Sequence, residues 1–393
     1  MNREIVLAAP VRTPIGRFGG ALAPLTAVDL GVVAARAAME RAHLPPDAVG
    51  QVIFGHARTA GCGPNPARQV GYRAGIPAEV PAYAINQACL SGLQAILAAA
   101  RAVELGEAEI VLAGGMESMS RVPYLLPEAR WGTRMGDREI VDAMSRDGFL
   151  DPLSGMLMGE TAEVLAKHYA ISRREQDAYA ALSQTRCEDA RRQGRFHDEI
   201  VPVDVRDGKK TAVVERDEHA RDGVTEEALA KLAPVFDASG SVTAGNSSGI
   251  TDGAAAVLVL SREAAARRGI APMARIVGWR VVGVAPEMMG IGPVPAVRGV
   301  LATAGIAISD VDLVELNEAF AAQVLAVERD LGLDRDRLNV NGGAIALGHP
   351  IGCSGARVVV TLLHELARRQ ARRGLATLCV SGGMGGALLL ERP

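Results

Sequence analysis

The fold is decided by the stretch Asn339-Val-Asn-Gly-Gly-Ala-Ile-Ala-Leu-Gly-His-Pro-Ile-Gly-Cys-Ser-Gly-Ala-Arg357. It sets one histidine, His349, in a turn of glycines and a proline, just ahead of an apolar run with helical character. Glycines gather this densely where the backbone approaches a ligand closely or takes φ > 0. We therefore expect His349 to be exposed, held by stiff backbone near a helix N-terminus, and part of a functional site.

Working outward from this stretch, the chain repeats itself. Ser354-Gly355 is matched by Ser91-Gly92, and each pair opens a helical pattern. Residues 305–316 match 43–54 in apolar pattern, and the strand-like runs 109–116 and 376–384 both end in Gly-Gly-Met. Strand, helix and strand, twice over, is typical of a buried sheet with helices on its faces. The sequence therefore predicts an α/β fold of two similar halves.

A segment of different composition, 120–242, separates the two copies. It is rich in Arg, Asp, Glu, Pro and Met, and it contains amphipathic patterns at 159–169 and 172–193. Ser172 and Glu175 form a capping box, which marks a helix start. Residues 242–261, a polar loop running into an expected buried helix and strand, should return to the first half. We predict an N-terminal half (1–119 plus 243–271), an inserted loop domain over the site (120–242) and a C-terminal half (272–393).

Composition narrows the class of protein. The net charge of −3 gives no electrostatic case for nucleic acid. The longest apolar runs fall short of the roughly 20 residues that cross a membrane, and the first residues have a strand pattern rather than that of a signal peptide. The five cysteines show no CxxC spacing, so neither a disulfide framework nor a zinc site is expected. A cytoplasmic protein is the prediction.

Cys89 lies in Asn86-Gln-Ala-Cys-Leu-Ser-Gly92, just before a helical run. At a helix N-terminus the free N–H groups favour the thiolate, so we expect a pKa below the usual value of about 8.5. The alternative is a small buried side chain, as most free cysteines are. Because the repeat puts the turns of Cys89 and His349 at equivalent corners of the two halves, a face-to-face arrangement would bring thiol and imidazole together.

Two further polar positions end predicted strands. Cys379 precedes the glycine-rich turn 381–386, which could present N–H groups to an anion, although core packing is the alternative. Asn317 follows the apolar strand 311–316, where α/β folds bind ligands, but it could also be a helix N-cap. Cys353 is interpreted as structural, and Cys62 and Cys187 have no supporting neighbours.

Together these motifs resemble the thiolase family, the acyl-CoA C-acyltransferases, over essentially the whole chain from Ala9 to Gly386. The resemblance implies two βαβαβαββ halves in a five-layer α/β/α/β/α core, with a loop domain inserted after the first. It implies reversible, CoA-dependent cleavage of a 3-ketoacyl-CoA to acyl-CoA and acetyl-CoA, and condensation of two acetyl-CoA to acetoacetyl-CoA. CoA would be a co-substrate, with no metal and no nicotinamide, in a homodimer or homotetramer.

The resemblance also implies roles for individual residues. Cys89 is the nucleophile that becomes acylated, His349 activates it, and Cys379 is the second acid/base, at the α-carbon of acetyl-CoA. Asn317 holds a water that, with His349, stabilises the enolate oxyanion. The backbone N–H groups of Cys89 and of Ser381, where the family usually has glycine, would form a second oxyanion hole.

Residues that would contact CoA or the acyl chain are carried over in the same way. Ser248 and Ala244 would contact pantetheine and Arg221 the adenosine phosphates, and the apolar walls would be formed by Met158, Phe236, Ala319 and Phe320. Leu157 stands where short-chain members commonly have histidine, which makes the pocket more apolar.

Three alternatives stay open at this point. A decarboxylating condensing enzyme of the same superfamily would not need Cys379. A Cys/His/Asn hydrolase would use Cys89, His349 and Asn317 but would leave Cys379 unexplained. A non-catalytic, thiolase-like binding protein would keep the fold without a reactive thiol.

Overall fold

The computed structural model describes residues 3–132, 134–207 and 210–393. Its centre is a ten-stranded sheet, and one strand, β2 (Gly16–Arg17), pairs with β10 off the main path. Along that path the strands follow the order β12 (Leu313–Leu316), β13 (Arg373–Val380), β14 (Met384–Glu391), β11 (Ala274–Gly283), β1 (Ile5–Arg12), β10 (Thr251–Ser261), β5 (Ile110–Ser118), β3 (Gln51–Gly55) and β4 (Ala82–Ile85).

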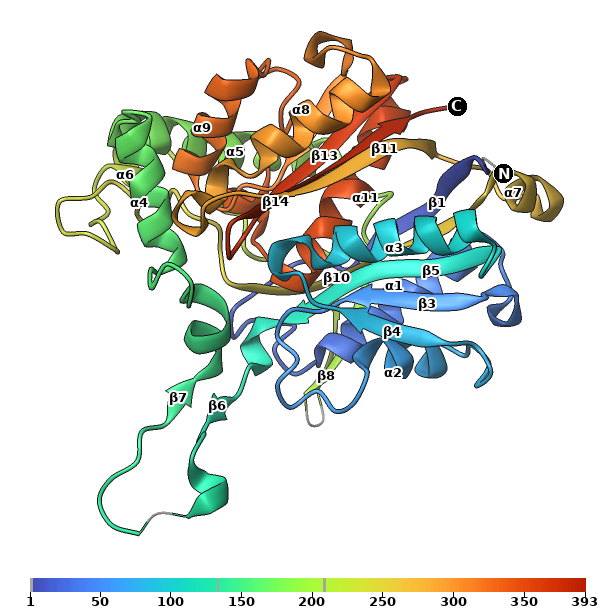
Figure 1. Ribbon diagram of the computed structural model, residues 1–393, viewed down its shortest axis with the longest axis horizontal. Coiled ribbons are helices and arrows are strands. Elements are labelled where there is room, and N and C mark those ends of the chain that lie inside the picture. The colour runs from blue at the N-terminus through green and yellow to red at the C-terminus, as the bar shows by residue number, and fades with distance from the viewer. Residues whose placement is uncertain (1–2, 133, 208–209) are drawn as a thin grey trace.

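The sheet consists of two similar halves joined at one seam. Only Val6 and Leu7 of β1 pair with β11, so the strands from β1 to β4 and those from β11 to β12 form two layers (Figure 1). In each half a 3₁₀ turn, 46–48 or 308–310, leads into a strand that runs parallel to its neighbour, β3 beside β5 and β12 beside β13. The duplication predicted from the sequence is therefore present in the fold.

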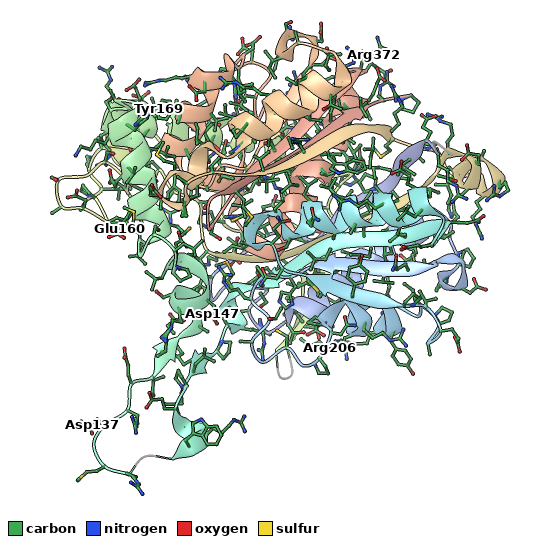
Figure 2. The ribbon with its side chains drawn as sticks, viewed as in Figure 1. Asp137, Asp147, Glu160, Tyr169, Arg206 and Arg372 are labelled. Atoms are coloured by element: carbon green, nitrogen blue, oxygen red, sulfur yellow. The ribbon has the colours of Figure 1, made fainter. Side chains whose placement is uncertain are left out.

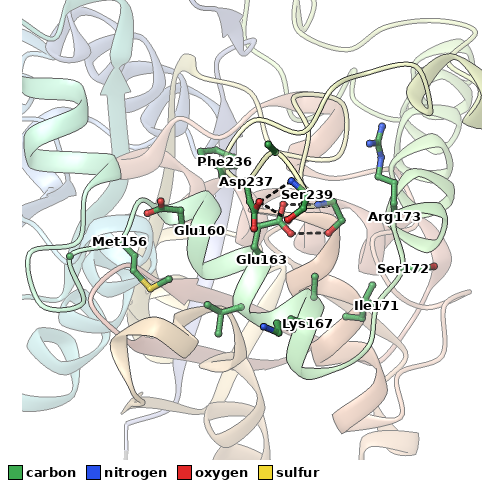
Figure 3. A pocket seen from close by; sticks show the side chains of 16 residues that line it. Met156, Glu160, Glu163, Lys167, Ile171, Ser172, Arg173, Phe236, Asp237 and Ser239 are labelled. Atoms are coloured by element: carbon green, nitrogen blue, oxygen red, sulfur yellow. Dashed lines mark hydrogen bonds between the residues drawn. The ribbon is translucent and has the colours of Figure 1, made fainter.

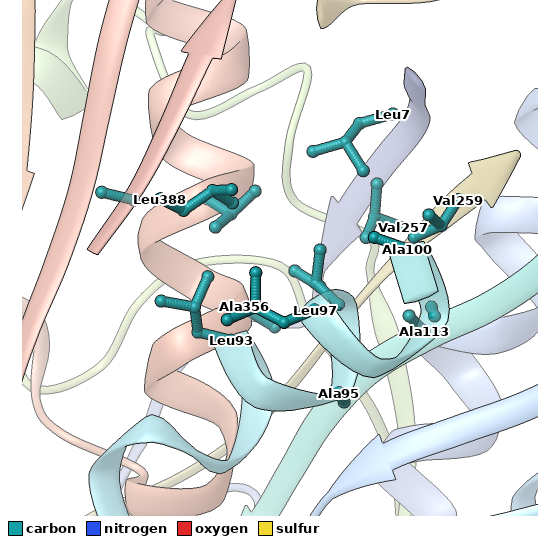
Figure 4. Close-up of a cluster of buried hydrophobic side chains, with 14 of the residues drawn as sticks. Leu7, Leu93, Ala95, Leu97, Ala100, Ala113, Val257, Val259, Ala356 and Leu388 are labelled. Carbon is teal, nitrogen blue, oxygen red and sulfur yellow. The ribbon is translucent and has the colours of Figure 1, made fainter. Parts of the chain in front are cut away.

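Helices complete five layers. On the outer faces lie α1 (Ala27–Arg41) with α2 (Pro66–Arg73), and α8 (Pro293–Ala304) with α9 (Ala321–Leu331). Between the two sheets lie α3 (Ser91–Leu105) and α11 (Ile351–Arg369), whose apolar side chains meet strands of both halves (Figures 1 and 4). This arrangement confirms the predicted α/β/α/β/α core.

The two central helices touch backbone to backbone. A Cβ built on Gly92 would lie 2.6 Å from the Ala356 nitrogen, and one on Gly355 would lie 2.3 Å from the Leu93 nitrogen. Only glycine permits this approach. Among the described residues, 88–105 is the one helical segment long and apolar enough to cross a membrane, and 61% of it is buried in this middle layer, as expected of a core helix.

The segment between the halves contains an arm, a helical part and a hairpin. The arm carries β6 (Tyr124–Leu125) and β7 (Val141–Asp142) and projects from the body (Figure 1). Next come α4 (Met158–His168) and α5 (Arg173–Arg192), then β8 (Val203–Asp207), β9 (Lys210–Val214) and α6 (Glu226–Leu229). Ser172 and Glu175 form the predicted capping box at the start of α5.

One expectation about secondary structure is wrong. Residues 242–261 were expected to include a helix before the strand, but the apolar part is a single strand, β10. Its run of alanines favours a helix by intrinsic propensity, but hydrogen bonds to β1 on one side and β5 on the other override that preference and make it a strand. A short helix, α7 (Arg262–Arg268), follows it, and α10 (Ala344–Leu347) precedes His349.

Candidate active site

Cys89 lies in a tightly tied turn at the start of α3. Ala88, just before it, has a left-handed φ of 45°, and its N–H donates to the Asn86 side chain at 3.0 Å. The Ser91 hydroxyl accepts from the Gln87 N–H at 2.8 Å and donates to the Ala88 carbonyl at 2.6 Å. These bonds fix the backbone on both sides of the half-buried Cys89.

The C-terminal half brings His349 to this thiol. Its Nε2 lies 3.3 Å from the Cys89 Sγ, and its backbone N–H donates to the Gly249 carbonyl at 2.9 Å. The predicted juxtaposition of the two turns is therefore present. The expected exposure of His349 is wrong, because its side of the turn faces the seam between the halves and only 7% of the residue is exposed.

A short chain of hydrogen bonds defines the proton on His349. The Ser354 hydroxyl lies 3.0 Å from the Pro350 carbonyl, which can only accept, so the hydroxyl hydrogen is donated there. The His349 Nδ1 lies 2.5 Å from the same hydroxyl oxygen and must therefore be the donor in that contact. Nε2 is left as the acceptor, and its lone pair faces the Cys89 thiol.

Burial keeps both partners neutral. Burial, followed by the positive charges of Arg357 and Arg58, lowers the pKa of His349 to about 3. Burial raises the pKa of the Cys89 thiol, although the charge of Arg58 and backbone hydrogen bonds oppose the rise. The lowered pKa expected for Cys89 from its helix N-terminus is thus not found, because desolvation outweighs the helix end. The resting pair is a neutral thiol beside a neutral base.

The backbone N–H groups of Cys89 and Ser381, the pair expected to form an oxyanion hole, lie close enough to the Cys89 sulfur to oppose the rise in its pKa. Ser381 follows β13 and does not have a left-handed φ, whereas Gly382 and Gly383 take φ of 83° and 79°. The serine side chain is therefore compatible with the turn, since the strained positions belong to the glycines that follow it.

Cys379 lies two residues before Ser381, on β13, and is 1% exposed. Burial, and the nearby Cys89, raise the pKa of its thiol well above the usual range. Its neighbours form an apolar cluster made of Met158, Met289, Ala319 and Phe320. Cys379 is thus a protonated thiol in a dry environment, and it lies near enough to Cys89 that a negative charge on one thiol would oppose ionisation of the other.

Asn317, directly after β12, is fully buried. Neither its side-chain oxygen nor its nitrogen has a hydrogen-bond partner among the described residues. It is not the N-cap of the following helix, because α9 begins at Ala321 with Phe320 at its cap. A buried amide without a protein partner is suited to hold a water or a substrate oxygen.

The residues expected to contact CoA fall into two groups. Phe236 and Phe320 meet edge to face at 6.4 Å, and the Ser248 N–H donates to the Ala319 carbonyl at 3.0 Å, next to the cluster around Cys379. Leu157 is half-buried at the N-terminus of α4. Ala244 and Arg221, in contrast, are exposed in loops, and the Arg221 N–H is bound to Gln184 on α5.

A cavity of about 1130 Å³ adjoins this region, between α4 and the loop 236–241 (Figure 3). Phe236 lines it, and Glu163 anchors the loop through bonds to the N–H groups of Ser241 and Val242. Its lining carries the carboxylates of Glu160, Glu163 and Asp237 beside Lys167 and Arg173. This mixed charge does not favour phosphate groups over other ligands.

Sequence reasoning missed several groups around Cys89. One apolar cluster packs against the thiol and includes Ala57, Met119, Met144, Phe149 and Ile351. Ser354 was noted only as a marker of the repeat, although His349 and Ser354 occupy the positions N′ and N4 around the cap Pro350, whose side chains often meet. Among the described residues no group of three or more His, Cys, Asp or Glu could hold a metal ion.

Comparison with known proteins identifies the family. The family model "Thiolase, N-terminal domain" matches residues 5–263, and "Thiolase, C-terminal domain" matches 270–392. An acetyl-CoA acetyltransferase of Thiocystis violacea is 52% identical over 393 residues, covering 100% of both chains.

Two solved structures superpose over the full length. The acetyl-CoA acetyltransferase of Bacillus anthracis has a TM-score of 0.98 at 47% identity, covering 100% of this chain and 99% of its own. Human mitochondrial 3-ketoacyl-CoA thiolase in complex with CoA has a TM-score of 0.96 at 46% identity, covering 100% and 98%. The family models and the full-length relatives agree with the predicted resemblance, and this chain belongs to the thiolase family.

Proposed function

We propose that this thiolase is an acyltransferase that reversibly cleaves 3-ketoacyl-CoA with CoA, through an acyl group carried on Cys89. The observation that carries the proposal is the contact of 3.3 Å between the Cys89 Sγ and a neutral His349 Nε2, with a protonated Cys379 beside the same thiol. One nucleophile, one base and one separate acid are what a carbon–carbon cleavage through a thioester requires.

In the first step, His349 Nε2 accepts the Cys89 proton while the sulfur bonds to the C3 carbonyl carbon of the substrate. The negative charge that develops on the C3 oxygen would be met by the N–H groups of Cys89 and Ser381, which lie near the sulfur. Losing one such donor typically costs about 3–4 kcal/mol in the barrier.

In the second step, the C2–C3 bond breaks and the electron pair passes to the acetyl-CoA enolate. Cys379 donates its proton to C2, which releases acetyl-CoA and leaves the acyl group on Cys89. The enolate oxygen would bind the imidazolium of His349 and a water held by Asn317, whose amide has no protein partner among the described residues. Attack by the thiol of CoA, with its proton returned to Cys379, then releases acyl-CoA, and the departing Cys89 sulfur takes its proton back from His349. Condensation is the reverse.

CoA serves as co-substrate in this scheme, and no further cofactor is required. We place the pantetheine end between Ser248 and the Phe236–Phe320 pair, which leads toward Cys379 through Ala319. The adenosine phosphates would then lie near the exposed Arg221 rather than in the cavity of mixed charge. A cytoplasmic location remains a prediction from the sequence.

We also propose that the chain assembles as a homodimer or homotetramer. The arm that contains β6 and β7 carries large apolar side chains that face solvent in the single chain (Figure 2). Trp131 is 86% exposed and Met135 is 90% exposed. Exposed apolar groups of this size usually mark a protein interface.

The test is CoA-dependent cleavage of acetoacetyl-CoA and of 3-ketodecanoyl-CoA, with Cys89→Ala as control. We expect wild-type activity on at least one substrate and none in the variant. Acyl release to water instead of to CoA would favour the hydrolase, and condensation only with a carboxylated donor would favour the decarboxylating enzyme. Activity that survives Cys89→Ala would contradict the proposal. The ratio of the two rates shows the chain length preferred beside Leu157.

A further inference from the structure

Arg58 is a buried cation whose guanidinium has no hydrogen-bond or ion-pair partner among the described residues. It follows β3 by three residues, and only 7% of it is exposed. Its backbone N–H donates to Glu117 at 3.1 Å, but its guanidinium forms no hydrogen bond or ion pair with any described residue, and its Nε is fully enclosed. An unpaired buried guanidinium is costly, so a site that retains one usually meets an anion.

The buried acidic group that binds the Arg58 backbone is already paired with another cation. Glu117 forms an ion pair with His56 at 3.2 Å and accepts backbone N–H groups from Ala57 and Gly352. Although burial opposes it, the nearby side chains of Cys62 and Glu117 raise the pKa of His56 to about 9, so the imidazole is cationic at neutral pH. One carboxylate therefore faces two cations, and the cluster of His56, Arg58 and Glu117 carries a net positive charge.

The guanidinium lies close to the cluster that surrounds the reacting thiol. It packs on Gly148, where an added Cβ would lie 2.2 Å from Nη2. Phe149 and Ala57, the sequence neighbours of these two residues, belong to the apolar cluster that packs against Cys89. The charge of Arg58 also acts on both Cys89 and His349. Asp147, which precedes Gly148 in the chain (Figure 2), is exposed, and no ion pair joins it to Arg58.

From this arrangement we infer that Arg58 binds the far end of the acyl chain, and that the preferred substrates are 3-ketoacyl-CoA thioesters whose acyl chain ends in a carboxylate. The inference rests on the proposed function. The methylenes of such a chain would lie against Met144, Phe149 and Ile351, and its carboxylate would pair with Arg58. A planar guanidinium and a carboxylate match in shape and can share two hydrogen bonds.

The experiment compares substrates of equal length that differ only at the chain end. The pairs are 3-oxohexanedioyl-CoA against 3-oxohexanoyl-CoA, and 3-oxoheptanedioyl-CoA against 3-oxoheptanoyl-CoA. Because a charge-assisted bond replaces an unpaired buried cation, we expect kcat/KM to favour the carboxylate in at least one pair by roughly 10- to 100-fold. Within one enzyme this ratio cancels any general change in activity.

Variants separate binding from an effect on the thiol. Arg58→Leu should invert the ratio, whereas Arg58→Lys, which keeps the charge but loses the paired donors, should retain part of the preference. Asp147→Asn is a matched control that should keep the wild-type ratio. If Arg58→Leu does not fold, the wild-type ratio and Arg58→Lys still decide.

Three results would overturn the inference. One is a wild-type preference for the methyl-terminated substrate in both pairs. Another is an Arg58→Leu enzyme that loses activity equally on both members of a pair, which would assign the arginine to the thiolate alone. In both cases acetoacetyl-CoA cleavage would survive in the wild type, so the proposed function stands. Absence of cleavage of every substrate, acetoacetyl-CoA included, would instead refute both.

Discussion

Ser354→Ala tests how the proton on His349 is placed. In the wild type, the Ser354 hydroxyl donates to the Pro350 carbonyl at 3.0 Å and accepts from the His349 Nδ1 at 2.5 Å. This arrangement leaves the Nε2 lone pair directed at the Cys89 Sγ, 3.3 Å away. Ser354 does not touch the thiol, so it acts as a positioning residue.

Removing the hydroxyl leaves a buried Nδ1–H without an acceptor, which costs about 1–3 kcal/mol. The imidazole can escape this cost by moving its proton to Nε2, where it faces the thiol and can no longer accept. Since about 1.4 kcal/mol corresponds to a factor of ten, we expect kcat/KM for acetoacetyl-CoA to fall roughly 10- to 100-fold. KM should change little, because the hydroxyl is 1% exposed and buried behind the imidazole.

The assay combines steady-state kinetics with ¹⁵N NMR of the histidine ring. Wild type should show a protonated Nδ1 and an unprotonated Nε2 at neutral pH, and Ser354→Ala should show a mixture. Ser354→Thr, which keeps the hydroxyl, should recover part of the lost rate. A wild-type ring protonated on Nε2, or unchanged kinetics in Ser354→Ala, would refute the reasoning.

Two further predictions follow from the buried groups. Cys379→Ala should slow the exchange of the acetyl-CoA α-protons with deuterated water by roughly 10²- to 10⁴-fold. Acylation of Cys89 by acetyl-CoA should continue in this variant. Loss of both activities together would contradict separate roles for the two cysteines. His56 has a folded pKa of about 9, above its ordinary value of 6.5, so its protonation contributes stability that is fully present below pH 6.5 and is lost as pH rises through 9. Urea unfolding should therefore show that the pH-dependent part of the difference in unfolding free energy between wild type and His56→Gln is roughly 3 kcal/mol near pH 6 and disappears above pH 10. A difference that grows with pH would exclude the His56–Glu117 pair as its source.

The features that the sequence predicts well are those that repeat or carry local signals. The pairs Ser91-Gly92 and Ser354-Gly355 locate the two central helices, and the capping box at Ser172 marks the start of α5. The turns of Cys89 and His349 are predicted to meet because the halves are equivalent, and the structure places their side chains in contact. Each of these inferences needs only backbone pattern and symmetry.

The features that the sequence does not predict depend on desolvation and on contacts between distant segments. A helix N-terminus favours a thiolate, yet the pKa of Cys89 is raised, because the neighbouring layer of the other half excludes water from it. The isolation of Arg58 could not be inferred either, since it requires that Glu117, 59 positions along the chain from that backbone amide, is already paired with His56. Local patterns carry no information about which charges remain unpaired after folding.

The crossing of the two central helices explains why the repeat and the active site are inseparable. Cys89 precedes α3, and His349 precedes α11, so their distance depends on how closely the helices approach. At Gly92 and Gly355 an added Cβ would lie 2.6 Å and 2.3 Å from backbone nitrogens of the opposite helix, well inside van der Waals contact. A methyl group at either position would have to push the helices apart by about 1 Å, since carbon and other heavy atoms pack at roughly 3.5–4.0 Å. That displacement would open the Sγ–Nε2 contact beyond the distance needed for proton transfer. The two glycines therefore maintain the distance between Cys89 and His349 as well as the packing of the core, because the same contact between the helices determines both.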